Sequence, residues 1–118
     1  MNGSMLRFYL HEDARQGGKA AWEWLLERAN ELGIRGGSAF KAIAGFGHQH
    51  HLSERRPLDL NGSQITEVEF LVAEEEATRL LDLVQTAGLR VFYARMPADL
   101  GGLSGADLKQ DALPRQPA

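Results

Sequence analysis

A strand followed by an amphipathic helix that ends at a glycine occurs twice in this chain of 118 residues, and this repetition limits the folds open to it. In the first half, apolar residues from Lys19 onward recur at three- and four-residue spacing up to Gly33. In the second half, a helix begins at residues 74–76, three glutamates that favour the positive end of the helix dipole, and ends at Gly88. A glycine after the last helical turn adopts the left-handed conformation without steric strain.

Four strand-like runs flank the two helices. Residues 5–11 and 65–72 alternate apolar and polar side chains, as half-buried strands do. Residues 38–46 are nearly uncharged, which predicts a central strand covered on both faces, and residues 89–95 give the last strand. This order predicts an α+β, ferredoxin-like βαββαβ fold, in which two helices cover one face of an antiparallel four-stranded sheet.

The second face of such a sheet needs a cover. We expect Tyr9 and Phe46 or its neighbours on that face, which is more apolar surface than a monomer leaves in water. The chain is therefore predicted to self-associate through the open face of the sheet. Residues 5–95 form the predicted domain, and residues 96–118, rich in proline and glycine, form a C-terminal tail that is flexible or docks on a neighbour.

Composition argues against several functional classes. Thirteen Lys plus Arg against sixteen Asp plus Glu give a net charge of −3, so no global positive field attracts nucleic acid or anionic lipid. The absence of cysteine excludes disulfides and thiolate chemistry. No apolar run approaches the roughly 20 residues that span a bilayer, so we expect a cytoplasmic protein without membrane insertion. No serine-hydrolase, metalloprotease or Walker motif is found, and we predict no catalytic residues and no enzyme.

The stretch Gly45-Phe46-Gly47-His48-Gln49-His50-His51 is the most unusual in the chain, and it opens a long polar connection over residues 48–63. Two glycines around an aromatic residue predict a bulged strand end whose exposed amides bind a phosphate or a carboxylate. His48 and His50 lie two apart, so on an extended segment they could converge on zinc or copper. The simpler interpretation is that they are solvated loop histidines.

A second anion site is suggested by Gly18-Lys19, immediately before the first helix. Backbone amides and an ammonium group at a helix start favour anions, because the dipole and the unpaired N–H donors act together. The structural alternative is that these residues form only a turn.

The chain resembles the uncharacterised PII-like family known as domain of unknown function 190. The resemblance covers about residues 5–95 and rests on the order of elements, the opening residues 6–10, Gly18-Lys19 and the run from Gly33 to Gly47. The wider PII superfamily implies a ferredoxin-like fold, a compact trimer and small-molecule effectors, often adenine nucleotides, bound in clefts between subunits.

In signalling PII proteins, a Gly-Phe-Gly-x-Gln run leads into the mobile T-loop. The matching residues here end at Gln49, so the resemblance implies a nucleotide contact at Gln49 and a T-loop over residues 50–62. Those proteins also hold the phosphates with a lysine-bearing loop after the second helix. This chain has a tight turn there, in which only Arg90 offers a cation, and that departure favours a mononucleotide or another small anion over ATP.

The predicted function is therefore that of a homotrimeric PII-like sensor in signal transduction, with a small anionic effector that could be an adenine nucleotide. The predicted effector-binding residues are Gly45, Phe46, Gly47, Gln49, Lys19 and Arg90. One alternative is a trimer that responds to a divalent metal through His48 and His50. Another is an interaction module that binds a partner protein through residues 48–63 or through the C-terminal tail, without a small ligand.

Overall fold

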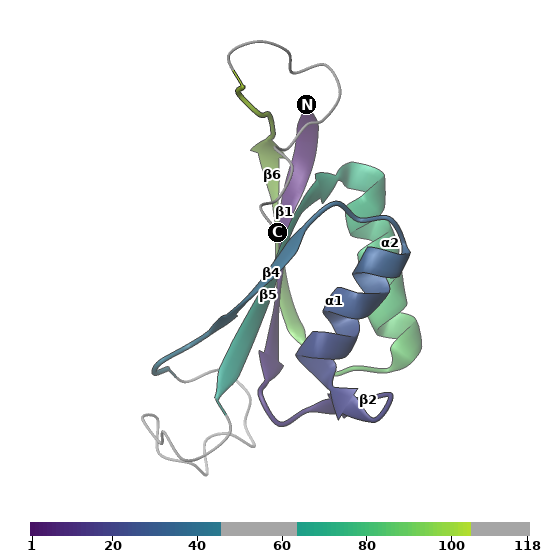
Figure 1. Ribbon diagram of the computed structural model, residues 1–118, viewed down its shortest axis with the longest axis vertical. Helices are drawn as coiled ribbons and strands as arrows, with labels where there is room; N and C mark the ends of the chain where they lie inside the picture. The colour runs from purple at the N-terminus through teal and green to yellow at the C-terminus, as the bar shows by residue number, and fades with distance from the viewer. Residues whose placement is uncertain (46–63, 105–118) are drawn as a thin grey trace.

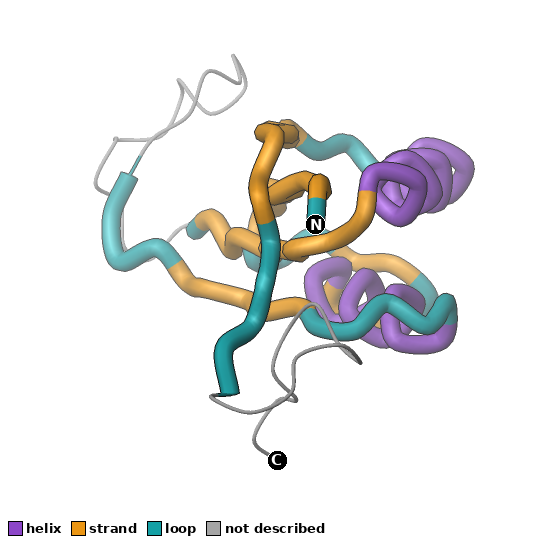
Figure 2. Tube along the Cα trace, turned by 90° about the horizontal axis from the view of Figure 1, so that it is seen from above, coloured by secondary structure: helices purple, strands orange, loops and turns teal. Residues whose placement is uncertain are grey.

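The computed structural model describes residues 1–45 and 64–104. Its elements are β1 (Asn2–His11), β2 (Arg15–Gln16), β3 (Lys19–Ala20), α1 (Ala21–Glu31), β4 (Gly37–Lys41), β5 (Ile65–Ala73), α2 (Glu74–Ala87) and β6 (Phe92–Asp99). Strands β4, β5, β1 and β6 form one antiparallel sheet in that spatial order. Both helices lie on the same side of this sheet (Figures 1 and 2). The predicted α+β, ferredoxin-like fold is confirmed.

The core lies between the sheet and the helices, and the period of two in the strands explains it. In β1, Leu6, Phe8 and Leu10 point to the helices and are at most 1% exposed, while the residues between them point to the other face. The rings of Phe8 and Phe70 meet edge to face, with centroids 6.2 Å apart. The helices contribute a stripe of buried side chains at three- and four-residue spacing: Ala21, Leu25, Ala29, Ala77, Leu80 and Val84.

Both helices end at the glycines that the sequence predicted. Gly33 has φ +86° and Gly88 has φ +78°, the left-handed region that favours glycine. At the start of α2, the Glu76 carboxylate accepts a hydrogen bond of 2.9 Å from the backbone N–H of Ala73. These local contacts define where each helix stops and where the chain turns back to the sheet.

Strand β4 corrects one prediction. It lies at an edge of the sheet, it ends at Lys41, and all five of its residues are exposed. The prediction of a central strand covered on both faces is therefore wrong. An uncharged run indicates that the segment is kept from water. It does not indicate whether the core of the same chain or another surface covers the segment. The strand still approaches the core at Gly37, because a Cβ there would come within 2.6 Å of the Phe70 ring.

The first and last strands extend beyond their predicted limits. Strand β1 begins at Asn2, and β6 covers Phe92–Asp99 instead of residues 89–95. Residues 96–99 of the predicted tail therefore belong to the sheet, where Pro97 is tolerated because β6 is an edge strand. Leu100 is buried, and its N–H donates to the Met1 carbonyl at 2.8 Å. Residues 105–118 lie outside the described part.

Candidate functional site

Several chain segments meet at one end of the sheet, which we call the loop end and define by His11, Lys41, Ile65 and Phe92. The register joins His11 to Ile65, Thr66 to Lys41, and Tyr9 to Phe92. The β2–β3 hairpin and the start of α1 lie at this end as well (Figure 1). Of the predicted effector-binding residues, the structure describes Lys19, Gly45 and Arg90. Lys19 lies in β3, Gly45 follows β4, and Arg90 precedes β6.

Lys19 lies in the β2–β3 hairpin, whose turn is made by Gly17 and Gly18 with φ +61° and +82°. Helix α1 begins two residues later, and the N–H of Ala21 donates to the Ala14 carbonyl. The Lys19 ammonium lies 2.5 Å from the Glu27 carboxylate, and this hydrogen bond raises the pKa of Lys19 above its usual value. An anion that binds Lys19 would therefore compete with Glu27.

Arg90 is exposed in the short connection between α2 and β6. Its guanidinium has no ion-pair partner within residues 1–45 and 64–104. Lys41, by contrast, is paired with Glu12 at 2.9 Å. Arg90 is therefore a cation at the loop end that the described chain does not already neutralise.

Gly45 follows β4 by four residues and is not part of a bulged strand. Its φ is not positive, and a Cβ built on it would meet nothing within 4 Å. Neither backbone conformation nor packing against the described chain requires glycine here. Phe46, Gly47, His48, Gln49 and His50 lie outside the described residues, as does the connection 48–63.

The open face of the sheet, opposite the helices, is a second candidate surface. Three large apolar side chains on it are about half exposed: Phe40 at 52%, Phe92 at 57% and Met96 at 44%. Tyr9 pairs with Phe92 in the register, and their ring centroids are 5.6 Å apart. Apolar groups at both edge strands leave a broad face for a partner to cover.

Comparison with known proteins gives the family. The sequence model of domain of unknown function 190 (DUF190), described as an uncharacterised ACR, matches residues 3–91. The chain belongs to the DUF190 family. A UPF0166 protein of Aquifex aeolicus (strain VF5) is 35% identical over 81 residues, which are 69% of this chain and 77% of that protein. The resemblance seen in the sequence is thereby confirmed.

Two solved structures share the fold of this DUF190 chain. One is a PII-like signalling protein from Thermus thermophilus, with a TM-score of 0.57 and 21% identity over 83% of this chain and 88% of that one. The other is CPII, a nitrogen regulatory PII-like protein from Thiomonas intermedia K12 bound to ADP, AMP and bicarbonate. CPII has a TM-score of 0.56 and 20% identity, with 88% of this chain and 98% of CPII covered. At this identity the likeness establishes a PII-like fold.

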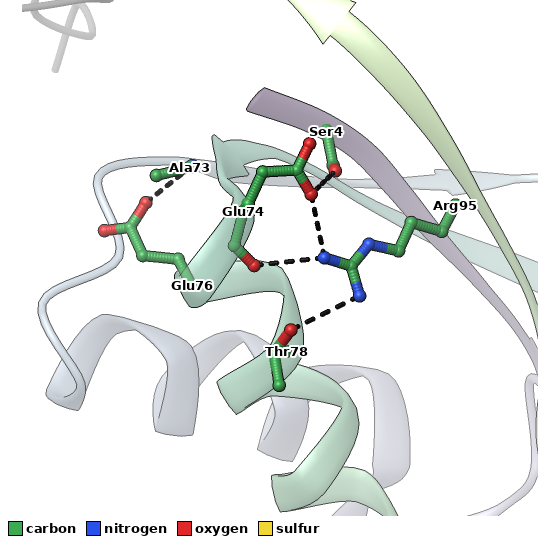
Figure 3. Close-up of polar contacts among 6 residues, drawn as sticks. All are labelled: Ser4, Ala73, Glu74, Glu76, Thr78 and Arg95. Carbon is green, nitrogen blue, oxygen red and sulfur yellow. Dashed lines mark hydrogen bonds and ion pairs between the residues drawn. The ribbon is translucent and has the colours of Figure 1, made fainter. Parts of the chain in front are cut away.

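One polar cluster of the DUF190 chain was not found by sequence reasoning. Arg95 on β6 donates to the Glu74 carboxylate at 2.8 Å and to the Glu74 carbonyl at 3.1 Å, and Ser4 donates to the same carboxylate at 2.9 Å (Figure 3). These contacts, with Arg95 first, hold the pKa of the Glu74 carboxyl below its usual range. In the sequence, Arg95 is only an arginine within a strand-like segment. The alternation of residues in a strand does not indicate which glutamate elsewhere in the chain it will bind.

Two negative findings apply to the described residues. Within residues 1–45 and 64–104, no group of three or more His, Asp or Glu side chains could hold a metal ion. None of the helices there has the length and apolar character needed to cross a membrane. The metal alternative based on His48 and His50 concerns residues outside this part of the chain.

Proposed function

We propose that this DUF190 chain is a homotrimeric PII-like sensor in signal transduction, and that it binds a small anionic effector without transforming it. The observation that carries the proposal is the fold it shares with CPII, which binds ADP, AMP and bicarbonate. Those three ligands are all anions. An adenine nucleotide is therefore the first effector to test.

The charges at the loop end support an anion of limited size. Arg90 is exposed and unpaired within the described part, and a guanidinium offers two parallel N–H donors to a phosphate. Lys19 is the second cation, but Glu27 already holds it. Among the predicted effector-binding residues, one cation is available and one is contested, and this suits a mononucleotide or diphosphate better than a triphosphate.

The open space beside Gly45 supports the same proposal. Gly45 is exposed, and a Cβ built on it would meet nothing within 4 Å in the described chain, so this position is open to a ligand or to a neighbouring subunit. We propose that Gly45, Phe46, Gly47 and Gln49 form the second wall of the effector site, with Gln49 as the contact to the nucleotide. Residues 48–63, which connect β4 to β5, are the proposed region that reports binding to a partner protein.

Self-association is part of the proposal because the open face exposes Phe40, Phe92 and Met96. Covering these side chains with further copies removes apolar surface from water at about 25 cal/mol per Å². The loop ends of neighbouring copies would then form the clefts in which the effector binds. A trimer is proposed because PII proteins, which this chain resembles, form trimers.

The experiment that tests the proposal is a thermal-shift screen of metal-stripped protein against adenine and guanine nucleotides, bicarbonate, zinc and copper. A ligand at a hundredfold excess over its dissociation constant stabilises the folded protein by about 2.7 kcal/mol, a readily measured shift. We expect AMP or ADP to raise the melting temperature, and both Gln49→Ala and Arg90→Ala to abolish the effect. Arg79→Ala, an exposed arginine in the middle of α2, is the matched control.

The other outcomes identify the alternatives. A shift caused only by zinc or copper, and lost in His48→Ala with His50→Ala, would replace the effector proposal with a metal-responsive trimer. No shift with any ligand would favour the interaction module. Mass measured in parallel by light scattering tests the trimer independently of ligand.

A further inference from the structure

The strand register arranges the open face in rows that run across the sheet. One row is aromatic, with a single carboxylate in it: Phe40, Glu67, Tyr9 and Phe92. The neighbouring row holds an ion pair between small residues: Ser38, Glu69, Arg7 and Ala94. The third row is apolar: Leu71, Met5 and Met96. The charged groups therefore lie near the centre of a face whose flanks are apolar.

The charged groups on the two central strands are unequally paired. The Arg7 guanidinium lies 2.5 Å from the Glu69 carboxylate but 3.5 Å from that of Glu67. The Arg7 Nε–H is buried and has no hydrogen-bond partner in the described chain. A single chain thus leaves Glu67 weakly held, and the Arg7 side chain, which is 31% exposed, can still be reached from the open face through its terminal nitrogens.

This arrangement becomes unfavourable once the face is covered. The side chains of Arg7, Glu67 and Glu69 are only partly exposed in the single chain. A partner surface that excludes the remaining water would leave Glu67 without a strong hydrogen-bond donor. A second copy supplies a donor, because its Arg7 binds Glu69 through Nη2, while Nη1 lies 3.5 Å from Glu67 of the same copy and keeps N–H groups for a stronger acceptor. Edge strands β4 and β6 add no charged residue to these rows, so no other cation on them competes for Glu67.

We propose that in the assembly Arg7 of one copy binds Glu67 of a neighbouring copy while it keeps its own Glu69. This inference rests on the proposed self-association through the open face and names the residues that select its geometry. The apolar flanks give the contact its area, and they tolerate many orientations. The cross-copy ion pair tolerates few, because an Arg and a carboxylate that are buried and misaligned oppose association.

A double-mutant cycle in the association constant tests the inference. The variants Arg7→Met and Glu67→Gln, and the double variant, are measured by sedimentation velocity over a range of concentrations. We expect each single variant to weaken association at least about tenfold, which corresponds to ~1.4 kcal/mol. The double variant should be no weaker than the worse single variant, since both remove the same contact.

Arg7→Met leaves two glutamates without a cation, so Arg7→Lys is measured beside it. Lysine keeps the charge but lacks the planar fork, and we expect association to fall about threefold to tenfold with the fold unchanged by circular dichroism. The control is a cycle on Arg28 and Glu31, an ion pair of 3.1 Å on α1, away from the open face. It should leave the association constant unchanged.

The outcomes separate this inference from the proposed function. If the parent protein is a trimer and the Arg7 and Glu67 variants weaken association additively, or not at all, the cross-copy pair is overturned and the trimeric sensor stands. If the parent protein is a monomer at micromolar concentration, both the inference and the proposed assembly are overturned. Nucleotide binding is scored separately, by thermal shift.

Discussion

The guanidinium of Arg95 donates a hydrogen bond of 2.8 Å to the carboxylate of Glu74, although the two residues are 21 positions apart in the chain. The contact joins β6, an edge strand, to the first turn of α2, and Ser4 joins it from β1. Figure 3 shows the three side chains converging, with Thr78 also within reach of Arg95 at 3.4 Å. Glu74 therefore links the last strand to the first turn of α2.

Glu74→Gln should lower stability at neutral pH and weaken its dependence on acid. The pKa of Glu74 is lowered in the folded state, first by Arg95 and then by Ser4, so its stabilising effect is present above the unfolded pKa of about 4.3. That effect is lost as pH falls through the lower folded pKa. Melting temperatures from pH 7 to pH 2.5 should converge for parent and variant at the acid end. Glu75→Gln, in the same helical turn, is the control, and equal behaviour of the two variants would contradict this role for Glu74.

Gly37→Ala should destabilise the sheet edge. A Cβ at this position would lie 2.6 Å from the Phe70 ring and 3.0 Å from Leu26, so one of these groups must move. Overpacking of this kind lowers the free energy of unfolding by about 1–3 kcal/mol. Urea unfolding measures it, with Gly101→Ala as the control, because a Cβ at Gly101 meets nothing within 4 Å. A loss as small as that of the control would mean that β4 can shift outward freely.

Glu27→Gln and Lys19→Met should change effector affinity in opposite directions if Lys19 binds the anion. The Glu27 carboxylate lies 2.5 Å from the Lys19 ammonium, so neutralising it frees the cation for a phosphate. We expect AMP or ADP affinity to rise severalfold in Glu27→Gln and to fall in Lys19→Met. Titration calorimetry measures both, and Glu31→Gln on the same helix controls for net charge.

The same two variants should hardly change stability. Both side chains of the pair are well exposed, and water and salt screen an ion pair at the surface so strongly that it adds little to the free energy of unfolding. If Glu27→Gln left affinity unchanged and Lys19→Met did too, Lys19 would be removed from the proposed effector site.

Phe92→Ser and Phe40→Ser should shift the assembly toward monomer without unfolding the chain. Both side chains are more than half exposed in the single chain, so their loss opens no cavity in the core. Light scattering at a series of concentrations should give a lower mean mass than the parent, with an unchanged circular dichroism spectrum. Leu103→Ser removes a side chain that is 91% exposed and lies beyond β6, and it should have no effect. Parent-like mass for both phenylalanine variants would argue against association through the open face.

The order of elements was predictable because it depends on local chemistry. Alternation in residues 5–11 and 65–72, helical spacing after Lys19, and glycines at positions 33 and 88 each specify a segment by its own periodicity or backbone freedom. Those signals sufficed for the ferredoxin-like fold. Of the candidate site, the sequence could name Lys19 and Gly45, and the family resemblance added Arg90 and gave the reason to combine them with Gln49.

Relations between distant segments were decided only by the tertiary structure. Nothing in the sequence indicates that Glu27 binds Lys19, that Glu74 meets Arg95, or that β4 is an edge strand, because each depends on which segments the folded sheet brings side by side. An uncharged run such as residues 38–46 has the same composition whether its own core or another surface covers it. Periodicity records which side of a segment avoids water, and only the assembled fold determines what lies against that side.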